Sequence, residues 1–331
     1  MAELSIAMLG VAAGQESRLA RFLHTAHRFV SPEARQQRID ALISLRFGAE
    51  EARWFAPRLI HLPGAGQDAI DFRRVGDDCA VCNVFEHEIP IAEYGMAAVL
   101  THAIGYLPMV QAFDSEHFAE RYAARAPHAE VHGKALGLVG YGHIGREIAL
   151  RARAFGMRIL AVTRSGLAPG ADQAYPVAQL QSMLAQADFI LVACPLTEQT
   201  RGLIGAVEFA VMKRTAVIIN VGRAPIIDEE ALYRALSEQR IAGATLDVWY
   251  AYPSAGQPQA RPSRFPFESL PNVHCTPHAC AWTEEMFDRR YALIADNLRR
   301  LADGRPLLNM IHAARSGAAP DAGAATPAKP N

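Results

Sequence analysis

The sequence predicts an α/β protein built from two Rossmann-like or flavodoxin-like domains, each with a doubly wound parallel sheet, and a cleft between them. Short, nearly continuous apolar runs alternate with segments whose apolar residues recur at helical spacing, as expected for parallel strands buried on both faces. A chain of 331 residues is long for one domain and comfortable for two. Since 50% of the residues are hydrophobic, two cores can be buried.

The first hundred residues predict a smaller α/β domain. Strands are expected at 4–10, 41–47, 58–62 and 79–84, with a helix at 16–26. A long helix is expected over 91–110, "IAEYGMAAVLTHAIGYLPMV", leading into the middle of the chain.

The middle of the chain shows the most regular alternation of strands and helices. Nearly continuous apolar runs predict strands at 135–140, 158–163, 188–193, 215–221, 243–248 and 272–276. The segments between them have helical spacing, which indicates a parallel sheet with right-handed crossovers.

A second long helix, expected at 284–304, returns the chain to the first domain. The predicted domains are therefore a discontinuous one, residues 1–98 and 284–312, and a continuous one, residues 99–283. The Ala-, Gly- and Pro-rich tail, 313–331, is expected to be disordered.

Composition narrows the class of protein. A net charge of −1 and a pI near 6.9 give no indication of a nucleic-acid or membrane partner. No apolar run reaches transmembrane length, and the N-terminus has no basic segment typical of a signal peptide. Cys79 and Cys82 have C-x-x-C spacing without a second pair, so no metal site is expected. The cysteines indicate buried thiols and a cytoplasmic protein.

The segment "VGYGHIG" carries Gly140, Gly142 and Gly145 in G-x-G-x-x-G spacing, after a predicted strand and at the start of a predicted helix. In this context the first glycine makes the tight turn, the second admits a pyrophosphate, and the third allows close helix–strand packing. The helix start, with His143 and Ile144, offers free backbone N–H groups to the phosphates. The alternative is a glycine-rich turn without a ligand, and we favour dinucleotide binding.

The end of the next predicted strand, "RILAVTRSG", lacks the acid that usually holds the ribose 2′-hydroxyl of NAD. Thr163, Arg164 and Ser165 stand there instead, and a cation with two hydroxyls suits a 2′-phosphate. This favours NADP and leaves NAD open, the alternative being that Arg164 is only a solvated loop residue.

Three further polar residues follow later strands, where ligands of such sheets bind: Arg223, Asp247 and His278. Singly they could be a surface cation, a helix cap and a loop histidine. Together they indicate hydride-transfer machinery, in which arginine holds a carboxylate and histidine exchanges the hydroxyl proton.

The order and spacing of "GKALGLVGYGHIG", "CPLTEQTRGLI", "INVGRAPIIDEEAL", "AGATLDVW" and "TPHACAWTEE" resemble the D-isomer-specific 2-hydroxyacid dehydrogenases. The resemblance implies a homodimer with the active site in the cleft between its domains. It also implies that residues 1–98 and 284–312 are a discontinuous substrate domain and that residues 99–283 are the dinucleotide-binding domain. It also implies that Arg223 binds the substrate carboxylate and carbonyl, that His278 is the acid/base, and that Asp247 lies near the nicotinamide carboxamide. Further cofactor contacts are implied at Cys194, Pro195, Thr200, Val221 and Gly222. Backbone amides at Gly64, Ala65 and Gly66 would bind the substrate carboxylate, and Trp282 would narrow the pocket.

The sequence departs from this family at Tyr252. The family usually carries an acid five positions after the aspartate, bonded to the catalytic histidine, and the formate dehydrogenases carry glutamine there. Tyr252 can orient His278 through its hydroxyl but supplies no charge at neutral pH. Alternatively Tyr252 only packs and another acid serves; Glu86, Glu88 and Glu284 are the candidates.

The sequence therefore predicts an NAD(P)-dependent reductase that converts a small 2-keto acid, such as glyoxylate, hydroxypyruvate or a bulkier one, to a D-2-hydroxy acid. The altered position 252 keeps open hydride transfer from a formate- or phosphite-like substrate without a proton relay. A nucleotide-sensing binding protein of the corepressor type is the third alternative.

Overall fold

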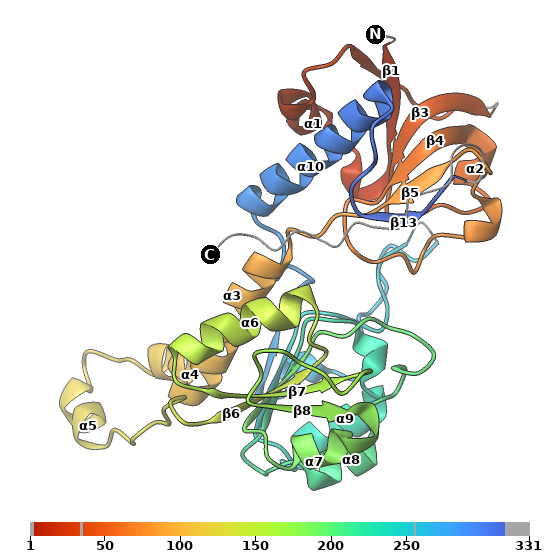
Figure 1. Ribbon diagram of the computed structural model, residues 1–331. Coiled ribbons are helices and arrows are strands. Elements are labelled where there is room, and N and C mark those ends of the chain that lie inside the picture. The colour runs from red at the N-terminus through yellow and green to blue at the C-terminus, as the bar shows by residue number, and fades with distance from the viewer. Residues whose placement is uncertain (1–2, 34–35, 255, 315–331) are drawn as a thin grey trace. The chain divides into compact units, whose positions relative to one another are not determined.

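A computed structural model describes residues 3–33, 36–254 and 256–314 of the chain. The chain divides into two compact units (Figure 1): unit 1 comprises Met1–Phe85 and Asp288–Asn331, and unit 2 comprises Glu86–Phe287. Most of the expected tail, 313–331, lies outside the described residues. Within the described ranges, no helix combines the length and the apolar character that a bilayer crossing requires.

Unit 1 contains, in its described residues, a sheet with strand order β13-β5-β4-β3-β1-β2. Neighbouring strands from β1 to β5 are parallel, with Ile6 opposite Ala41 in the β1–β3 pair, and β13 is antiparallel to β5. The strands are β1 Leu4–Met8, β2 His27–Phe29, β3 Gln37–Ile43, β4 Phe55–His61, β5 Ala80–Cys82 and β13 Met310–His312. The α-helices are α1 Glu16–Leu23, α2 Glu51–Trp54 and α10 Glu284–Asp303, the last of which begins in unit 2.

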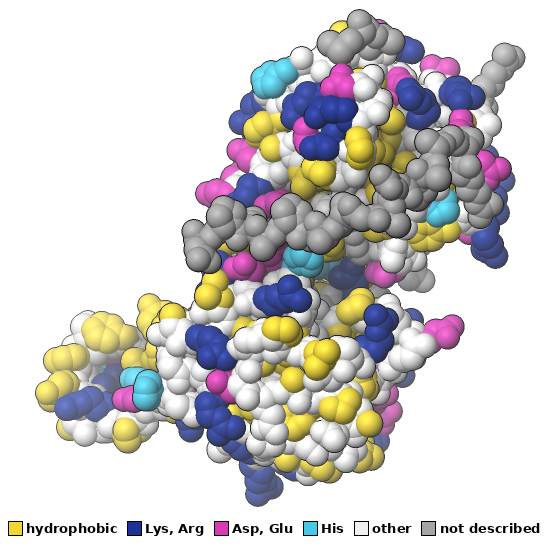
Figure 2. Space-filling model, viewed as in Figure 1, with side chains coloured by type: hydrophobic (Ala, Val, Ile, Leu, Met, Phe, Trp, Pro, Cys, Tyr) yellow, Lys and Arg dark blue, Asp and Glu magenta, His cyan; other side chains and the backbone are white. Residues whose placement is uncertain are grey.

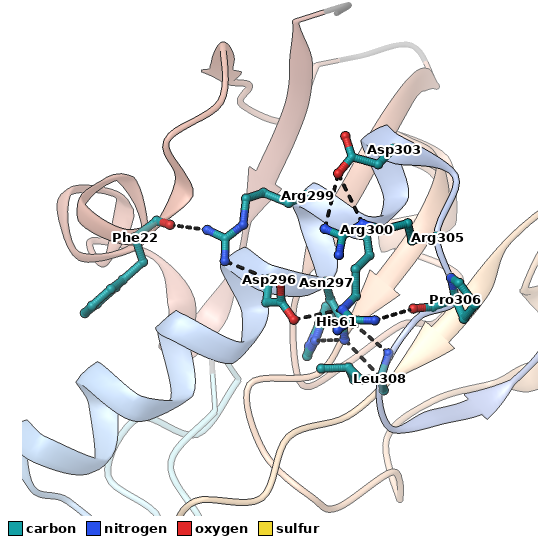
Figure 3. A network of polar contacts seen from close by, with 10 residues as sticks. All are labelled: Phe22, His61, Asp296, Asn297, Arg299, Arg300, Asp303, Arg305, Pro306 and Leu308. Atoms are coloured by element: carbon teal, nitrogen blue, oxygen red, sulfur yellow. Dashed lines mark hydrogen bonds and ion pairs between the residues drawn. The ribbon is translucent and has the colours of Figure 1, made fainter. Parts of the chain in front are cut away.

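A network of buried hydrogen bonds connects α10 to this sheet (Figure 3). The His61 imidazole is fully buried at the end of β4, and its Nε2 lies 2.9 Å from Asn297 Nδ2 of α10. Asn297 also donates to Leu308 O and accepts from Leu308 N, at 3.0 and 2.7 Å. One asparagine thus joins β4, α10 and the segment that precedes β13.

Unit 2 contains a parallel sheet with strand order β12-β11-β10-β9-β6-β7-β8 among its described residues. The strands are β6 Ala135–Val139, β7 Arg158–Thr163, β8 Gln173–Pro176, β9 Phe189–Val192, β10 Val217–Asn220, β11 Gly243–Leu246 and β12 Val273–Cys275. The α-helices are α3 Glu88–Ile104, α4 Tyr106–Gln111, α5 Phe118–Ala123, α6 His143–Ala154, α7 Leu180–Leu184, α8 Ala206–Val211 and α9 Glu229–Ser237. The chain runs outward from β6 to β8 and then restarts at β9 on the other side of β6, so the topological switch point lies between β6 and β9.

Both faces of the unit 2 sheet are buried, which explains the continuous apolar runs of its strands. Successive residues of β6 alternate between two hydrophobic clusters: Val139 packs in one, and Leu136 and Leu138 in the other. Each face is covered by helices, as the predicted doubly wound fold requires. The predicted fold class, two α/β domains with parallel sheets, is confirmed.

Several features differ from the expectations: the short strands β2 and β13 were not predicted, and the strand expected at 41–47 lies at Gln37–Ile43. Strand β8 was not predicted, because only Tyr175 of its residues is buried. The helix expected over 91–110 is divided at Gly105, whose φ of +68° ends α3 before α4 begins. The boundary expected after residue 98 lies between 85 and 86 in the structure, because α3 packs against α6 within the core of unit 2.

Candidate active site

The glycine-rich turn joins β6 to the start of α6. Gly140 has a φ of +103°, and a Cβ there would lie 2.8 Å from Cys194 N. A Cβ on Gly145 would lie 2.5 Å from Gly140 O, so this helix can approach its strand only because position 145 has no side chain. At Gly142, the N-cap of α6, a Cβ would meet nothing within 4 Å. The second glycine therefore leaves room in front of the helix N-terminus, and this cradle fits a dinucleotide pyrophosphate.

The loop after β9 lies beside this turn, at the switch point. Cys194 lies against Gly140, and the loop is closed by Thr200 Oγ1, which donates to Pro195 O and accepts from Thr197 N, both at 2.7 Å. Of the residues expected here to contact a cofactor, Cys194 thus lies against the glycine-rich turn and Thr200 closes its own loop.

The turn after β7 holds the three residues expected to select NADP. Thr163 Oγ1 donates to Leu167 O at 3.1 Å, and Ser165 Oγ accepts from Leu167 N at 3.3 Å, so both hydroxyls close the turn. Arg164 is exposed, and none of the hydrogen bonds or ion pairs found in the described ranges involves its guanidinium. The turn presents a cation at the carboxyl end of the strand.

The segment after β10 places Val221, Gly222 and Arg223 in a turn that Asn220 holds. Asn220 is 2% exposed; its Oδ1 accepts from Gly222 N at 3.1 Å and its Nδ2 donates to Arg223 O at 3.3 Å. The half-buried Arg223 side chain folds over its own turn and donates through Nη1 to Gly222 O at 3.0 Å. Asn220 was missed in the sequence, although a polar residue ending the apolar run "VIIN" was a usable signal.

Asp247 follows β11 and is completely buried. Its Oδ1 accepts from Thr276 Oγ1 at 2.6 Å and from Ala279 N at 2.8 Å, and its Oδ2 accepts from Cys280 N at 3.0 Å. The carboxylate therefore fixes the chain on both sides of His278. A contact between Asp247 and the nicotinamide stays a prediction.

Thr276, which precedes His278 in the same loop, makes two further hydrogen bonds within unit 2. Its hydroxyl lies 2.6 Å from Tyr94 Oη of α3, and its carbonyl accepts from Trp249 Nε1 at 2.9 Å. The aromatic residues that follow Asp247 are thus part of the framework around His278.

His278 and Tyr252 are in direct contact. Tyr252 Oη lies 2.9 Å from His278 Nδ1 and also accepts a 3.0 Å hydrogen bond from Trp249 N. Burial lowers the pKa of His278 below its usual value, and Arg223 lowers it further, against the opposing effect of Asp247. Burial raises the pKa of Tyr252. In the described part of the chain, the hydrogen bond found for the His278 ring is the one with Tyr252, and a role for Glu86, Glu88 or Glu284 stays a prediction.

The glycine-rich turn and the loops with Arg223, Asp247 and His278 all follow strands of one parallel sheet, so they meet at one edge. The sequence model "D-isomer specific 2-hydroxyacid dehydrogenase, NAD binding domain" matches residues 96–280. The chain belongs to the D-isomer specific 2-hydroxyacid dehydrogenase family.

Two proteins with similar sequences are named as reductases. A glyoxylate reductase of Korarchaeum cryptofilum is 37% identical over 186 residues, which cover 55% of this chain and 53% of the relative. A glyoxylate/hydroxypyruvate reductase B of Klebsiella pneumoniae is 35% identical over 225 residues, 67% of each. The match with the first relative thus spans only about half of that relative's length.

A solved structure extends the likeness to nearly the whole chain. The D-isomer specific 2-hydroxyacid dehydrogenase from Xanthobacter autotrophicus Py2, in complex with NADPH and MES, has a TM-score of 0.74 and 26% identity and covers 94% of this chain and 98% of that one.

Two expected substrate-binding elements of this family member lie in different units. Trp282 in unit 2 is 59% exposed and packs edge-on against Phe287, with ring centroids 4.7 Å apart. Gly64, Ala65 and Gly66 form a loop after β4 in unit 1, where Ala65 O accepts from Asn83 Nδ2 at 3.1 Å. Across the described residues, none of the hydrogen bonds uses the backbone N–H groups of this loop as donors.

Proposed function

We propose that this chain is an oxidoreductase that uses NADPH in preference to NADH to reduce a small 2-keto acid to a D-2-hydroxy acid. The observation that carries the proposal is the common edge of the unit 2 sheet, where an open pyrophosphate cradle, a guanidinium and an imidazole follow the parallel strands β6, β10 and β12. The NADPH complex of the Xanthobacter family member supports the choice of cofactor.

Arg223 would bind the substrate carboxylate and polarise the ketone, because a planar guanidinium matches both oxygens of a carboxylate. His278 would supply the proton for the ketone oxygen. When bound, the reduced nicotinamide supplies the hydride for the carbonyl carbon. The backbone amides of Gly64, Ala65 and Gly66 in unit 1 are proposed to bind a carboxylate oxygen, and the donors of this loop, unused in the described residues, support that role.

We also propose that the protein is a homodimer. Large apolar side chains are exposed over α4, α5 and the turn between them, where Figure 2 shows hydrophobic atoms gathered. They are Tyr106, Leu107, Met109, Val110, Phe113, Phe118 and Tyr122. An exposed apolar segment of this kind marks an interaction surface, and a second copy would cover it. The cytoplasmic location stays a prediction.

Cofactor oxidation tests the proposed reaction. The protein is mixed with NADPH or NADH and each of glyoxylate, hydroxypyruvate and bulkier 2-keto acids, with loss of absorbance as the readout and chiral analysis of the product. We expect turnover with at least one keto acid, D product and a higher kcat/KM with NADPH. Oxidation of formate or phosphite by NADP⁺, without ketone reduction, would replace this function by proton-free hydride transfer. Cofactor binding without either reaction would favour a nucleotide-sensing protein.

A further inference from the structure

The hydroxyl of Tyr252 lies between a backbone nitrogen that can only donate and an imidazole nitrogen that can donate or accept. The backbone N–H of Trp249, at 3.0 Å, can only donate, so Tyr252 Oη accepts there. A phenol has a single proton, and within the described ranges His278 Nδ1, at 2.9 Å, is the acceptor that this proton reaches. The arrangement in which Tyr252 donates and Nδ1 accepts is the one that gives this proton a partner among the described residues.

This direction is opposite to that of a histidine paired with a carboxylate. A carboxylate only accepts, so it requires a proton on Nδ1. A neutral imidazole carries one proton, and when Nδ1 accepts from a phenol that proton must be on Nε2. Among the described residues, no hydrogen bond uses His278 Nε2, so this N–H is available to a substrate.

We propose that Tyr252 is a positioning residue that holds neutral His278 in its Nε2–H tautomer, so that the neutral imidazole, and not the imidazolium, gives its proton to the ketone oxygen. The proposal rests on the proposed function, because it concerns the proton that ketone reduction consumes.

The charges around the ring favour the neutral form. The titratable and charged groups that face this pair are Arg223, Asp247, Cys280 and the two partners themselves. Burial and the Arg223 cation lower the pKa of His278, and the Asp247 carboxylate, which opposes them, is already bonded to three donors of the loop. Burial and Arg223 therefore disfavour the imidazolium relative to the neutral ring.

The proton transfer balances without a further reactant. As hydride reaches the carbonyl carbon, the ketone oxygen takes the Nε2 proton of His278, and Nδ1 takes the proton of Tyr252 Oη. The phenolate that forms keeps the hydrogen bond from Trp249 N. Water then returns one proton to Tyr252, whose side chain is 44% exposed. One keto acid, one reduced cofactor and one solvent proton give one hydroxy acid and one oxidised cofactor.

The pH dependence of reduction tests this tautomer in the active enzyme. We expect a wild-type kcat/KM that is nearly constant from pH 6 to pH 9, because the neutral imidazole is the donor throughout. Tyr252→Phe removes the phenol proton and leaves only the imidazolium as donor. Its kcat/KM should match that of the wild type within about 3-fold at pH 5.5 and fall about 10–100-fold below it at pH 8.5.

Two further variants separate the tautomer from simple packing. Tyr252→Glu should place the proton on Nδ1 and raise the pKa of His278. The kcat/KM of Tyr252→Glu should therefore begin to fall at a higher pH than the kcat/KM of Tyr252→Phe. Tyr250→Phe is the matched control, because Tyr250 Oη donates to Ile227 O at 3.0 Å and not to His278. This control should keep the wild-type profile. A wild-type rate that declines near pH 6.5 together with that of Tyr252→Phe would refute the proposal.

Nitrogen NMR of the protein with ¹⁵N-labelled histidine gives a readout that does not depend on turnover. The signals of His278 are identified by their loss in His278→Asn. We expect a protonated Nε2 and an unprotonated Nδ1 at pH 7.5 in the wild type, and a mixture of tautomers in Tyr252→Phe. A protonated Nδ1 in the neutral wild-type ring would overturn the inference, even in a fully active enzyme. Failure to reduce any 2-keto acid would refute the proposed function, while the NMR result would still decide the tautomer.

Discussion

Thr276 Oγ1 and Asp247 Oδ1 lie 2.6 Å apart and join the ends of two neighbouring parallel strands, β12 and β11. Through this bond and two backbone N–H groups, a fully buried carboxylate holds the loop that carries His278. The candidate proton donor is thus positioned by the sheet edge itself.

Asp247→Asn should therefore destabilise unit 2 and displace His278. One carboxylate oxygen of Asp247 becomes an NH₂ group in the variant, and this group faces hydrogen-bond donors. A buried donor is then left without an acceptor. We expect the free energy of unfolding in urea to fall by about 2 kcal/mol. Asp228→Asn is the control, because Asp228 caps α9 by accepting from Ala231 N, and asparagine caps a helix equally well. Equal stability of the two variants would contradict the role of Asp247.

Arg164→Ala should weaken NADPH binding much more than NADH binding. The exposed guanidinium at the end of β7 is expected to contact the 2′-phosphate, and loss of a charge-assisted contact costs about 1.5–3 kcal/mol. Dissociation constants for both cofactors, measured by fluorescence titration, check this. Arg158→Ala, at the opposite end of the same strand, should change neither constant. Parallel weakening of both cofactors by Arg164→Ala would remove the NADP assignment.

Arg223→Lys should not restore the function of the guanidinium. A point ammonium cannot bind both oxygens of a carboxylate, so we expect kcat/KM for the preferred keto acid to fall on the order of 10²-fold or more. Arg234→Lys, in an exposed α9 ion pair with Glu230, should keep wild-type kinetics. A lysine enzyme with near-normal kcat/KM would show that Arg223 does not bind the substrate carboxylate.

Unit 1 should lose stability in acid through His61. Burial lowers the pKa of His61 to about 4 from its usual 6.5. Between these values the unfolded chain binds the proton and the folded chain does not. The stabilisation is therefore complete above pH 6.5 and is lost as the pH falls towards 4, at up to about 1.4 kcal/mol per pH unit and about 3 kcal/mol in all.

Urea unfolding at pH 7 and pH 4.5 measures this loss. His61→Asn should reduce the difference between the two pH values, since asparagine has no proton to gain in this range. The same replacement at the exposed His24, whose φ of +41° asparagine tolerates, should leave the difference unchanged. An unaltered difference in His61→Asn would assign the acid sensitivity to other groups.

Phe113→Glu should weaken the proposed homodimer. Phe113 is 68% exposed between α4 and α5, and a buried charge at the centre of an apolar contact should raise the dimer dissociation constant about 10²-fold. Sedimentation of the wild type and the variant checks this. Val207→Glu, an equally drastic change at an exposed residue of α8, should leave the mass unchanged. A monomeric wild type would refute the dimer.

The sequence predicted the parts of the site that local patterns define. Gly140, Gly142 and Gly145 could be found because a strand, a turn and a helix must follow one another there, and Arg223 and His278 because each ends an apolar run. Strand order was not predictable in this way. Nor was the bond between Tyr94 and Thr276, which are 182 positions apart in the chain. The sequence left two alternatives for Tyr252, a bond to His278 or packing alone. Sequence spacing does not determine which side chains of two different loops come into contact.

The buried His61–Asn297 pair has a consequence for synthesis of the protein. β4 leaves the ribosome early, yet the partner of its imidazole lies on α10, and the antiparallel edge strand β13 follows later still. Residues 1–85 cannot complete their sheet until almost the whole chain has been translated. Unit 2, which is continuous in sequence, can finish folding first. A chain truncated before α10 should therefore have residues 1–85 incompletely folded and bound by chaperones. Pulse proteolysis of stalled nascent chains would show whether unit 2 folds before unit 1.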